Sequence, residues 1–510
     1  MPTYLSPGVY VEEVEAGSRP IEGVGTAVAA FVGFAPQGPY NTPTLVTNWS
    51  QYTQVFGEFV EDGYLAHAVY GYFLNGGGAA YVVRIGGPRD NGAAAPPSGP
   101  SAALGQYRVA ARPAVAGPLP DGELSVEVVD PGEGTAEDRF TLVVKKSGKP
   151  AETFENVTAK KGKENVVTVV AERSKLITLE EVAGAAAKPA KGEVALRADP
   201  VAPPVPRTVS ADEYVGDVAE RTGFGGLEVV DEVTMVAVPD LMSAYQRGAV
   251  DLESVKAVQL AMVAHCELMG DRIAILDPPP GLSPQQIKDW RVDAAGYDSK
   301  YAALYYPWVK VFDAASGTNR YVPPAGHMAG IWARNDGTRG VHKAPANEVV
   351  RGAVALETQL TRSEQELLNP LGVNCIRTFP GRGIRVWGAR TLSSDPAWRY
   401  LNVRRLFNYL EESILNGTQW VVFEPNDDAL WARIRRTISA FLVNEWRRGA
   451  LFGLTPDEAF YVKCDRETNP AESIDAGQVI CEVGVAPVKP AEFVVFRLAQ
   501  ISGGTSLVNE

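Results

Sequence analysis

Apolar runs alternate with amphipathic stretches at the start of the chain. The run TAVAAFVGF is almost wholly apolar, which is typical of a strand buried on both faces. Further along, Val69, Tyr72 and Phe73 recur at the spacing of one helical face, and Gly76 would end that helix. The expected elements are a strand, a short helix, a longer helix and a second strand, at residues 26–34, 50–56, 65–75 and 80–85.

The same alternation resumes after residue 210. Its most regular part is a helix over residues 428–448, for which Asn426 is the expected cap and Leu430, Ile434 and Ile438 begin an apolar stripe. Strand and helix in this order predict a parallel or mixed sheet with helices packed on it. Strands are expected at 233–238, 272–276, 308–312, 420–423 and 478–485, and helices at 252–268, 347–368, 400–414 and 428–448.

The pattern between these two parts is different. Residues 86–120 are rich in Gly, Pro and Ala, the composition of a linker. Between residue 122 and residue 196, short alternating runs (LSVEVVD, RFTLVVKK, NVVTVVA and EVALRA) are separated by turn residues, which predicts strands of an antiparallel sheet. A Pro-rich stretch at 200–206 closes this part. We therefore expect a β module inserted on the surface of an α/β chain.

Both ends of the chain carry short strand-like segments set apart by prolines. Near the start, Val9 and Val11 fall on one side of a pleat; near the end, residues 492–499 are apolar on both faces except at Arg497. A strand must pair its backbone and bury its apolar faces somewhere, so these segments predict pairing with a neighbouring subunit. The expected arm residues are Val9, Tyr10, Val11, Phe493, Val494, Val495 and Phe496.

Composition narrows the class of protein. A length of 510 residues indicates roughly two to four domains, and 45% apolar with 21% charged residues is ordinary for globular domains. The net charge of -13 argues against nonspecific binding to nucleic acid or anionic lipid. Neither a signal peptide nor an apolar run of ~20 residues, long enough to span a bilayer, is found in the sequence. The four cysteines have no close pair in sequence and predict neither a disulfide framework nor a zinc site; they are Cys266, Cys375, Cys464 and Cys481.

Three expected strands end in a carboxylate, at Asp240, Asp277 and Asp313. Ligands of open α/β sheets gather at the carboxyl ends of strands, so these residues are candidates for a metal or phosphate site. Asp is also a common turn and cap residue, and we favour that structural explanation. No phosphate loop, dinucleotide fingerprint, GxSxG elbow or HExxH motif is present, so we expect no catalytic, cofactor-binding or metal-binding residues.

The helix over 428–448 combines its apolar stripe with several arginines. Charged side chains on a helix usually form a solvated face. In an acidic protein, arginines concentrated on one helix are also suited to an acidic partner, and Arg433, Arg435 and Arg436 are the candidates for that contact.

Several segments, taken together, resemble the contractile tail sheath protein family of phages and phage tail-like injection particles. The resemblance covers most of residues 1–90 and 210–500 and leaves out residues 91–207. Its motifs are YLSPGVYVEE from Tyr4, AFVGFAPQGP from Ala30, PPAGHMAGIWARND from Pro323, KAPAN from Lys343, FPGRGIRVWGARTLS from Phe379, NVRRL from Asn402, FEPND from Phe423 and KPAEFVVFRLAQ from Lys489.

The resemblance implies a mechanical polymer and not an enzyme. Such sheaths wrap an inner tube as stacked rings in a metastable extended state, and their contraction drives the tube through a target envelope. The implied partners are further copies of the chain, the inner tube protein, and baseplate and terminal cap proteins, without nucleic acid or membrane insertion. Assembly in the bacterial cytoplasm is implied as well. The alternatives are a metal-dependent α/β hydrolase using Asp240, Asp277 and Asp313, and a cell-surface adhesion module, which the missing signal peptide disfavours.

The expected architecture combines these inferences: a multidomain α/β (α+β) chain with a mixed-sheet core, discontinuous domains and terminal strands exchanged between subunits. The core is expected to be one discontinuous α/β domain followed by an inner C-terminal α/β domain, with the β module inserted in the first. The boundaries are an N-terminal arm at 1–22, the discontinuous domain at 23–90 and 208–362, the inserted outer module at 91–207, the inner domain at 363–486 and a C-terminal arm at 487–510.

Overall fold

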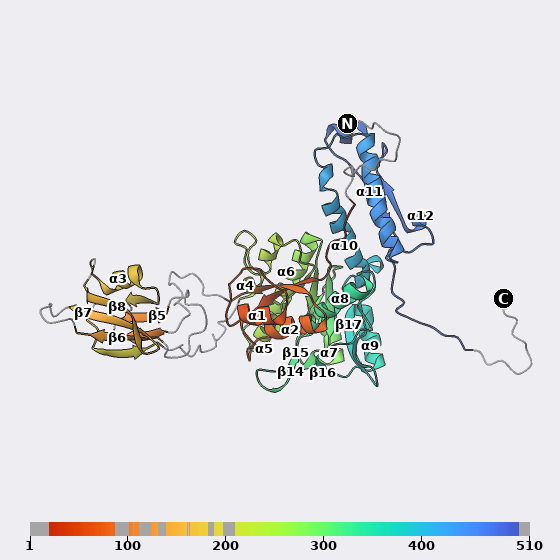
Figure 1. Ribbon diagram of the computed structural model, residues 1–510. Helices are drawn as coiled ribbons and strands as arrows, with labels where there is room; N and C mark the ends of the chain where they lie inside the picture. Colours follow the sequence, from red (N-terminus) through yellow and green to blue (C-terminus); the bar gives the residue numbers. More distant parts are fainter. Residues whose placement is uncertain are drawn as a thin grey trace, which may run out of the picture. The chain divides into compact units, whose positions relative to one another are not determined.

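The chain has a mixed α/β fold with several sheets and divides into two compact units (Figure 1). The smaller unit spans residues 88–207, and the larger one combines residues 1–87 and 208–510. The computed structural model describes residues 20–86, 101–105, 107–111, 124–130, 139–160, 162, 164–181, 188–196 and 210–498. The expected N-terminal arm residues Val9, Tyr10 and Val11 lie outside the described residues.

An eight-stranded sheet forms the centre of the larger unit (Figure 1). Its strand order is β18-β17-β13-β12-β11-β1-β3-β2, and neighbouring strands are parallel from β17 to β3. The two edge strands β18 and β2 are antiparallel to their neighbours. The strands are β1 (Val28–Gly33), β2 (Thr44–Val46), β3 (Ala79–Arg84), β11 (Met235–Ala237), β12 (Ile273–Leu276), β13 (Ala302–Tyr306), β17 (Val373–Phe379) and β18 (Gly383–Val386).

Helices pack on this sheet, and α2 (Leu65–Asn75) and α8 (Ala325–Arg339) approach each other closely. A Cβ atom at Gly326 would lie 2.4 Å from the backbone of Ala68, and one at Gly330 would lie 2.4 Å from the carbonyl oxygen of Tyr72. Glycines one helical turn apart therefore permit this contact. The other helices are α1 (Trp49–Phe56), α4 (Ala211–Val215), α5 (Asp240–Gln246), α6 (Leu252–Met269), α7 (Pro284–Asp289) and α9 (Arg362–Leu368).

The C-terminal part of the larger unit has its own apolar cluster. It lies between α10 (Leu401–Gly417) and α11 (Asp428–Arg447), where the rings of Tyr409 and Phe441 are 6.2 Å apart. Residue Ile21, near the start of the described chain, is buried in the same cluster. The remaining elements here are α12 (Pro456–Ala459), β19 (Phe460–Lys463), α13 (Ala471–Asp475) and β20 (Glu482–Val485). Strands β14 (Val309–Asp313), β15 (Thr318–Val322) and β16 (Ala353–Leu356) form a separate three-stranded sheet of the larger unit.

The smaller unit contains two antiparallel sheets around a separate apolar cluster. Val126, Phe140 and Leu142 are buried in that cluster, as is Val170 from the helix α3 (Val166–Arg173). Such a self-contained core is what an inserted domain requires. The sheets have the orders β10-β6-β7-β8 and β4-β5-β9; their strands are β4 (Ser101–Leu104), β5 (Tyr107–Ala111), β6 (Leu124–Val129), β7 (Arg139–Lys146), β8 (Lys149–Thr158), β9 (Ile177–Glu181) and β10 (Gly192–Ala195).

Most expected elements are confirmed, and four are wrong. NVVTVVA, expected as a strand, lies in α3, because Asn165 caps that helix by accepting from the backbone N–H groups of Val167 and Thr168. Residues 347–368 form β16 and α9 instead of one helix. The expected strand at 420–423 is replaced by a 3-10 helix at Gln419–Val421, and the expected linker contains β4 and β5.

Two further expectations need correction. Strands β17 and β18 belong to the central sheet, so the boundary expected at residue 363 does not separate two compact units. Helix α11 is capped by Asp427, whose carboxylate accepts from the N–H of Leu430 at 2.8 Å, whereas Asn426 accepts from the indole N–H of Trp431. Among the described helices, none has both the length and the apolar character needed to cross a membrane.

Candidate assembly surfaces

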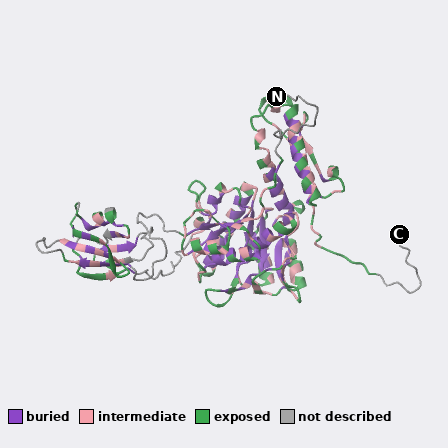
Figure 2. Cartoon of the chain, in the orientation of Figure 1, coloured by how far each residue is buried: buried purple, intermediate pink, exposed green. Residues whose placement is uncertain are grey.

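The chain beyond Glu492 is extended and exposed (Figure 2). Phe493 is 73% exposed, Val495 77% and Phe496 85%, and residues 491–498 belong to no helix or strand. Scattered apolar side chains are common on a surface, but a continuous run of this kind marks a site of association. The expected C-terminal arm residues therefore lie together on one exposed stretch of backbone.

Glu492 anchors the start of this exposed segment to the rest of the larger unit. Its carboxylate accepts from Arg390 Nε at 2.9 Å and Nη2 at 2.7 Å, a bidentate pair, and from Asn369 Nδ2 at 2.9 Å. Burial acts to raise the pKa of Glu492, but hydrogen bonds from Arg390 and Asn369 outweigh it and hold the pKa below its usual value. The chain is thus fixed at residue 492 and becomes exposed at the next residue. The sequence gives no sign of this pair, because its members are 102 positions apart.

The second surface is the small sheet formed by β19 and β20. Within the described residues, these two strands pair only with each other. Phe460, Val462 and Val485 pack against the apolar cluster of α10 and α11, whereas Tyr461 on the outer face is 60% exposed. An isolated two-stranded sheet is marginal in water, and its outer edges present unpaired backbone groups. This sheet is suited to receiving additional strands.

The candidate arginines of α11 differ in their surroundings. Arg433 lies 3.4 Å from Glu424 and over the ring of Trp420 at 4.4 Å. Arg435 donates to the carbonyl oxygen of Cys464. Arg436 is exposed and lies on the same helical face as Arg447, which is exposed as well. The guanidinium most suited to a partner is therefore that of Arg436, because the other two candidates have contacts within the chain.

Asp240 and Asp277 are buried and bind backbone N–H groups. Asp240 accepts from Phe34 at 2.6 Å and from Tyr64 at 2.5 Å, and burial raises its pKa to about 6 despite these bonds. Asp277 accepts from the N–H of Ala325 at 2.9 Å, in the first turn of α8, and burial raises its pKa to about 7. Both carboxylates join elements that are distant in sequence.

Asp313 is part of a tight turn, where it accepts from the N–H of Ala315 at 3.0 Å and from the hydroxyl of Ser316 at 2.9 Å. His67 Nε2 lies 3.4 Å from Asp313 Oδ1. Within the described part of the chain, no group of three or more His, Cys, Asp or Glu side chains could hold a metal ion. The three carboxylates expected as a possible hydrolase site therefore do not form a common metal site.

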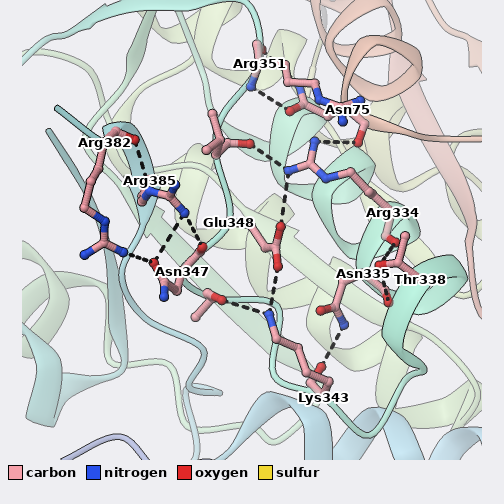
Figure 3. Close-up of polar contacts among 12 residues, drawn as sticks. Asn75, Arg334, Asn335, Thr338, Lys343, Asn347, Glu348, Arg351, Arg382 and Arg385 are labelled. Carbon is pink, nitrogen blue, oxygen red and sulfur yellow. Dashed lines mark hydrogen bonds and ion pairs between the residues drawn. The ribbon is translucent and has the colours of Figure 1, made fainter. Parts of the chain in front are cut away.

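A polar network orders the loop that carries the KAPAN motif (Figure 3). Glu348 pairs with Lys343 at 2.9 Å and with Arg334 of α8 at 3.7 Å, and Arg334 also donates to the carbonyl oxygen of Asn75 at 3.0 Å. Asn347 accepts from Arg382 at 2.8 Å and, through its carbonyl oxygen, from Arg385 at 2.7 Å. These contacts connect α2, α8 and β18. These contacts give the motif residues Lys343 and Asn347 a structural role.

Two of the four cysteines come close together through the pairing of β19 with β20. Cys464 and Cys481, which are distant in sequence, lie at neighbouring ends of β19 and β20, and the Cys464 thiol contributes to the raised pKa of Cys481. The two strands place them opposite each other because Lys463 pairs with Glu482. Cys266 and Cys375 are buried in the core of the central sheet.

Comparison with known proteins identifies relatives of both halves of the larger unit. Residues 228–392 match the family described as phage tail sheath protein central domain, and residues 393–501 match the phage tail sheath C-terminal domain. The tail sheath protein of Burkholderia phage BcepMu is 26% identical, with 96% of this chain and 95% of that protein covered. The tail sheath protein of Vibrio phage KVP40 is 27% identical over 45% of this chain, a match that spans 35% of the phage protein.

Solved structures give the same result over nearly the whole chain. The anti-feeding prophage helical sheath in its contracted state has a TM-score of 0.59 and 26% identity, covering 98% of this chain and 100% of that one. The sheath of an extracellular contractile injection system, PVC, also contracted, has a TM-score of 0.59 at 24% identity and covers 98% of this chain and 99% of its own. A chain of the anti-feeding prophage baseplate matches with a TM-score of 0.58 at 26% identity, covering 98% of this chain and 100% of that one.

Proposed function

Because this chain belongs to the phage tail sheath family and is a structural subunit of a contractile sheath, we propose that it polymerises helically around an inner tube and contracts to drive that tube through a target cell envelope. It is a component of a phage tail or a tail-like particle. The proposed partners are further copies of the chain, the inner tube protein, and baseplate and terminal cap proteins. Assembly takes place in the bacterial cytoplasm.

The observation that carries this proposal is that the described chain has both an exposed apolar segment and a small open sheet. Among the described residues, 493–496 have no strand partner, and β19 and β20 pair with no strand except each other. A segment from one subunit that enters the sheet of another would pair both sets of backbone groups. Repeated head to tail, such a contact builds an open helical polymer. The residues around Val9 serve as the second arm in the same way.

The free energy available to each joint is substantial. Full burial of one large apolar side chain contributes about 1.5–3 kcal/mol, from which the cost of ordering the arm must be subtracted. Main-chain pairing depends little on side-chain identity, so the same joints can persist in the extended and contracted lattices. Contraction then releases energy stored in the extended lattice, which is kinetically trapped, and requires no nucleotide.

The experiment compares two shortened chains by electron microscopy. A chain that stops after Glu492 keeps the pair with Arg390 and loses the apolar segment; a matched control stops after Leu498 and keeps both. We expect a folded monomer with unchanged circular dichroism from the first and cylinders from the second. Cylinders of normal length from the shorter chain would remove the C-terminal segment from the joint. A cut before Glu492 is less informative, because it leaves the mostly buried Arg390 without its carboxylate.

A further inference from the structure

The ends of β19 and β20 bring two thiols together. Lys463 and Glu482 are the last registered pair of these antiparallel strands, so Cys464 and Cys481 are the next residues on each side and face each other. Residues opposite each other in such a ladder have Cβ atoms about 4.5–5.5 Å apart, which is near the separation that a disulfide requires. Cys464 is buried, and Cys481 is partly exposed.

Asn469 holds the two segments in this position. Its amide nitrogen lies 3.8 Å from the sulfur of Cys464 and donates to the carbonyl oxygen of Ile480 at 3.0 Å. Its amide oxygen accepts from the N–H of Ile480 at 2.6 Å. One side chain thus contacts Cys464 itself and both backbone groups of the residue before Cys481. The separation of the two cysteines is therefore set by more than the strand register.

We propose that Cys464 and Cys481 are a site of covalent modification, at which a small-molecule disulfide oxidises the pair to an intramolecular disulfide. The partly exposed Cys481 loses its proton to solvent and attacks the reagent, whose sulfur–sulfur bond breaks and releases one thiolate. Cys464 then loses its proton and attacks the sulfur of Cys481, displacing the second half of the reagent. Two protein thiols are oxidised, and one small disulfide is reduced to two thiols.

The surroundings of the two thiols make formation of the disulfide slow, and the disulfide then fixes the small sheet. Burial raises the pKa of the Cys481 thiol to about 12, with the neighbouring Cys464 as a further cause, and burial also raises the pKa of Cys464. Few thiolates are present at neutral pH, so the exchange proceeds slowly. The disulfide closes the loop of residues 465–480 at the end of the small sheet. It fixes the register of β19 and β20 while no neighbouring arm occupies them, a consequence that rests on the proposed function.

The chemical test uses the full chain after reduction and removal of the reductant. It is incubated with oxidised glutathione, denatured, alkylated with iodoacetamide and digested with trypsin without reduction. We expect residues 464–466 to be joined to residues 467–497, and alkylation at Cys266 and Cys375 alone. The variant Cys481→Ser is the control and should leave Cys464 alkylated. Full alkylation of all four cysteines, or glutathione retained on Cys481 without the crosslink, would overturn the proposal.

A second measurement distinguishes a failure of this modification site from a failure of the proposed function. Reduced and oxidised proteins are allowed to form cylinders, which are then dissociated in a urea series and counted by electron microscopy. We expect a higher urea midpoint for the oxidised cylinders, and no difference after oxidant treatment of the Cys464→Ser, Cys481→Ser double variant. A crosslink without cylinders in either state would contradict the sheath function and leave the modification site standing. Cylinders with equal midpoints would show that the disulfide does not lock the sheet.

Discussion

At the scale of single residues, two buried carboxylates that follow strands connect separate elements of the fold. From the sequence alone, the same residues are candidates for a metal or catalytic site. Asp277 directly follows β12 and accepts from the N–H of Ala325, so it joins the central sheet to the start of α8. Asp240 does the same for the segments that carry Phe34 and Tyr64. A buried carboxylate that binds backbone groups needs neither metal nor substrate to account for it.

The raised pKa of Asp277 gives a test by pH. Its pKa is about 7 in the folded chain and about 3.9 when unfolded, so between these values the folded state binds a proton that the unfolded state lacks. Its contribution to the free energy of unfolding should therefore fall as pH rises from about 4 to about 7, by up to about 1.4 kcal/mol per pH unit. Urea unfolding of the wild type and of Asp277→Asn across this range measures the difference.

The control for this prediction is Asp251→Asn, at the exposed cap of α6. There the hydrogen bond from the N–H of Ser254 lowers the pKa of the carboxyl, so its titration lies below this pH range. Parallel stability curves for the wild type and Asp277→Asn would contradict the assignment. We also expect Asp277→Asn to assemble into cylinders, because the amide oxygen can still accept from Ala325.

At the scale of elements, α11 has an exposed face that we propose as the contact for a partner. Arg436 and Arg447 lie on it, separated by about three turns of helix. We expect the variant Arg436→Glu to weaken the extended complex with an acidic inner tube, since each exposed ion pair contributes about 0.2–1 kcal/mol. Cosedimentation with tube protein across a salt series measures this loss, while contracted sheath without a tube should still form.

Arg362→Glu is the matched control for this helix face. Arg362 is exposed on α9 and, within the part of the chain that the structure describes, forms an ion pair with Glu366 alone, so its reversal should leave tube binding unchanged. Equal tube binding by Arg436→Glu and the wild type would exclude this face of α11. Reversal of Arg435 is a poor test, because it also removes the hydrogen bond to Cys464.

The C-terminal segment can be tested by single prolines. Val495 is mostly exposed and belongs to no helix or strand, so Val495→Pro should change the free energy of unfolding by less than about 0.5 kcal/mol. Proline removes one backbone donor from a ladder, so we expect cylinders to be lost. Val495→Thr, which keeps the donor, should assemble.

The neighbouring position then distinguishes two kinds of joint. A strand inserted between two others uses every backbone N–H, whereas a strand added at an edge uses alternate ones. Loss of cylinders with both Val494→Pro and Val495→Pro indicates insertion, and loss with one of them indicates addition at an edge. Normal cylinders from both variants would contradict strand pairing by this segment.

The elements that the sequence predicts well are those with strong local signals. The helix of residues 65–75 is confirmed as α2. Its apolar face and the glycine that follows it both indicate a helix that ends at this position. The helix expected at 347–368 is wrong because Gly352 has a φ of +83° and β16 pairs with β14, a partner far away in the chain. Thr361 and Glu364 form a capping box that starts α9, a local signal that could have been recognised.

The candidate assembly site also has one part that the sequence predicts and another part that it does not. The exposed run Phe493 to Phe496 is visible in the sequence as apolar residues beyond the last core element. The anchor formed by Glu492 and Arg390 and the pairing of Cys464 with Cys481 depend on tertiary contacts, which no local pattern reports. Strand β13 was not predicted, because its position depends on pairing with β12 and β17 and not on a local sequence pattern.

At the scale of the whole molecule, the smaller unit is expected to be separable from assembly. It has its own apolar cluster and two sheets whose strands all come from residues 101–195. The family matches begin at residue 228 and do not include it. A peripheral module with a separate core can be removed at little cost if the remaining ends can be joined, because loop closure depends only weakly on loop length.

Replacing residues 95–203 with a short Gly/Ser linker should therefore leave a chain that unfolds at a similar urea midpoint and builds cylinders. The central sheet, α10, α11 and the small sheet all lie outside the deleted part, so every joint proposed above is retained. Electron microscopy of the shortened chain measures assembly, and the same deletion combined with a stop after Glu492 is the negative control. A shortened chain that folds but forms no cylinders would assign the module a direct role in the lattice and contradict this prediction.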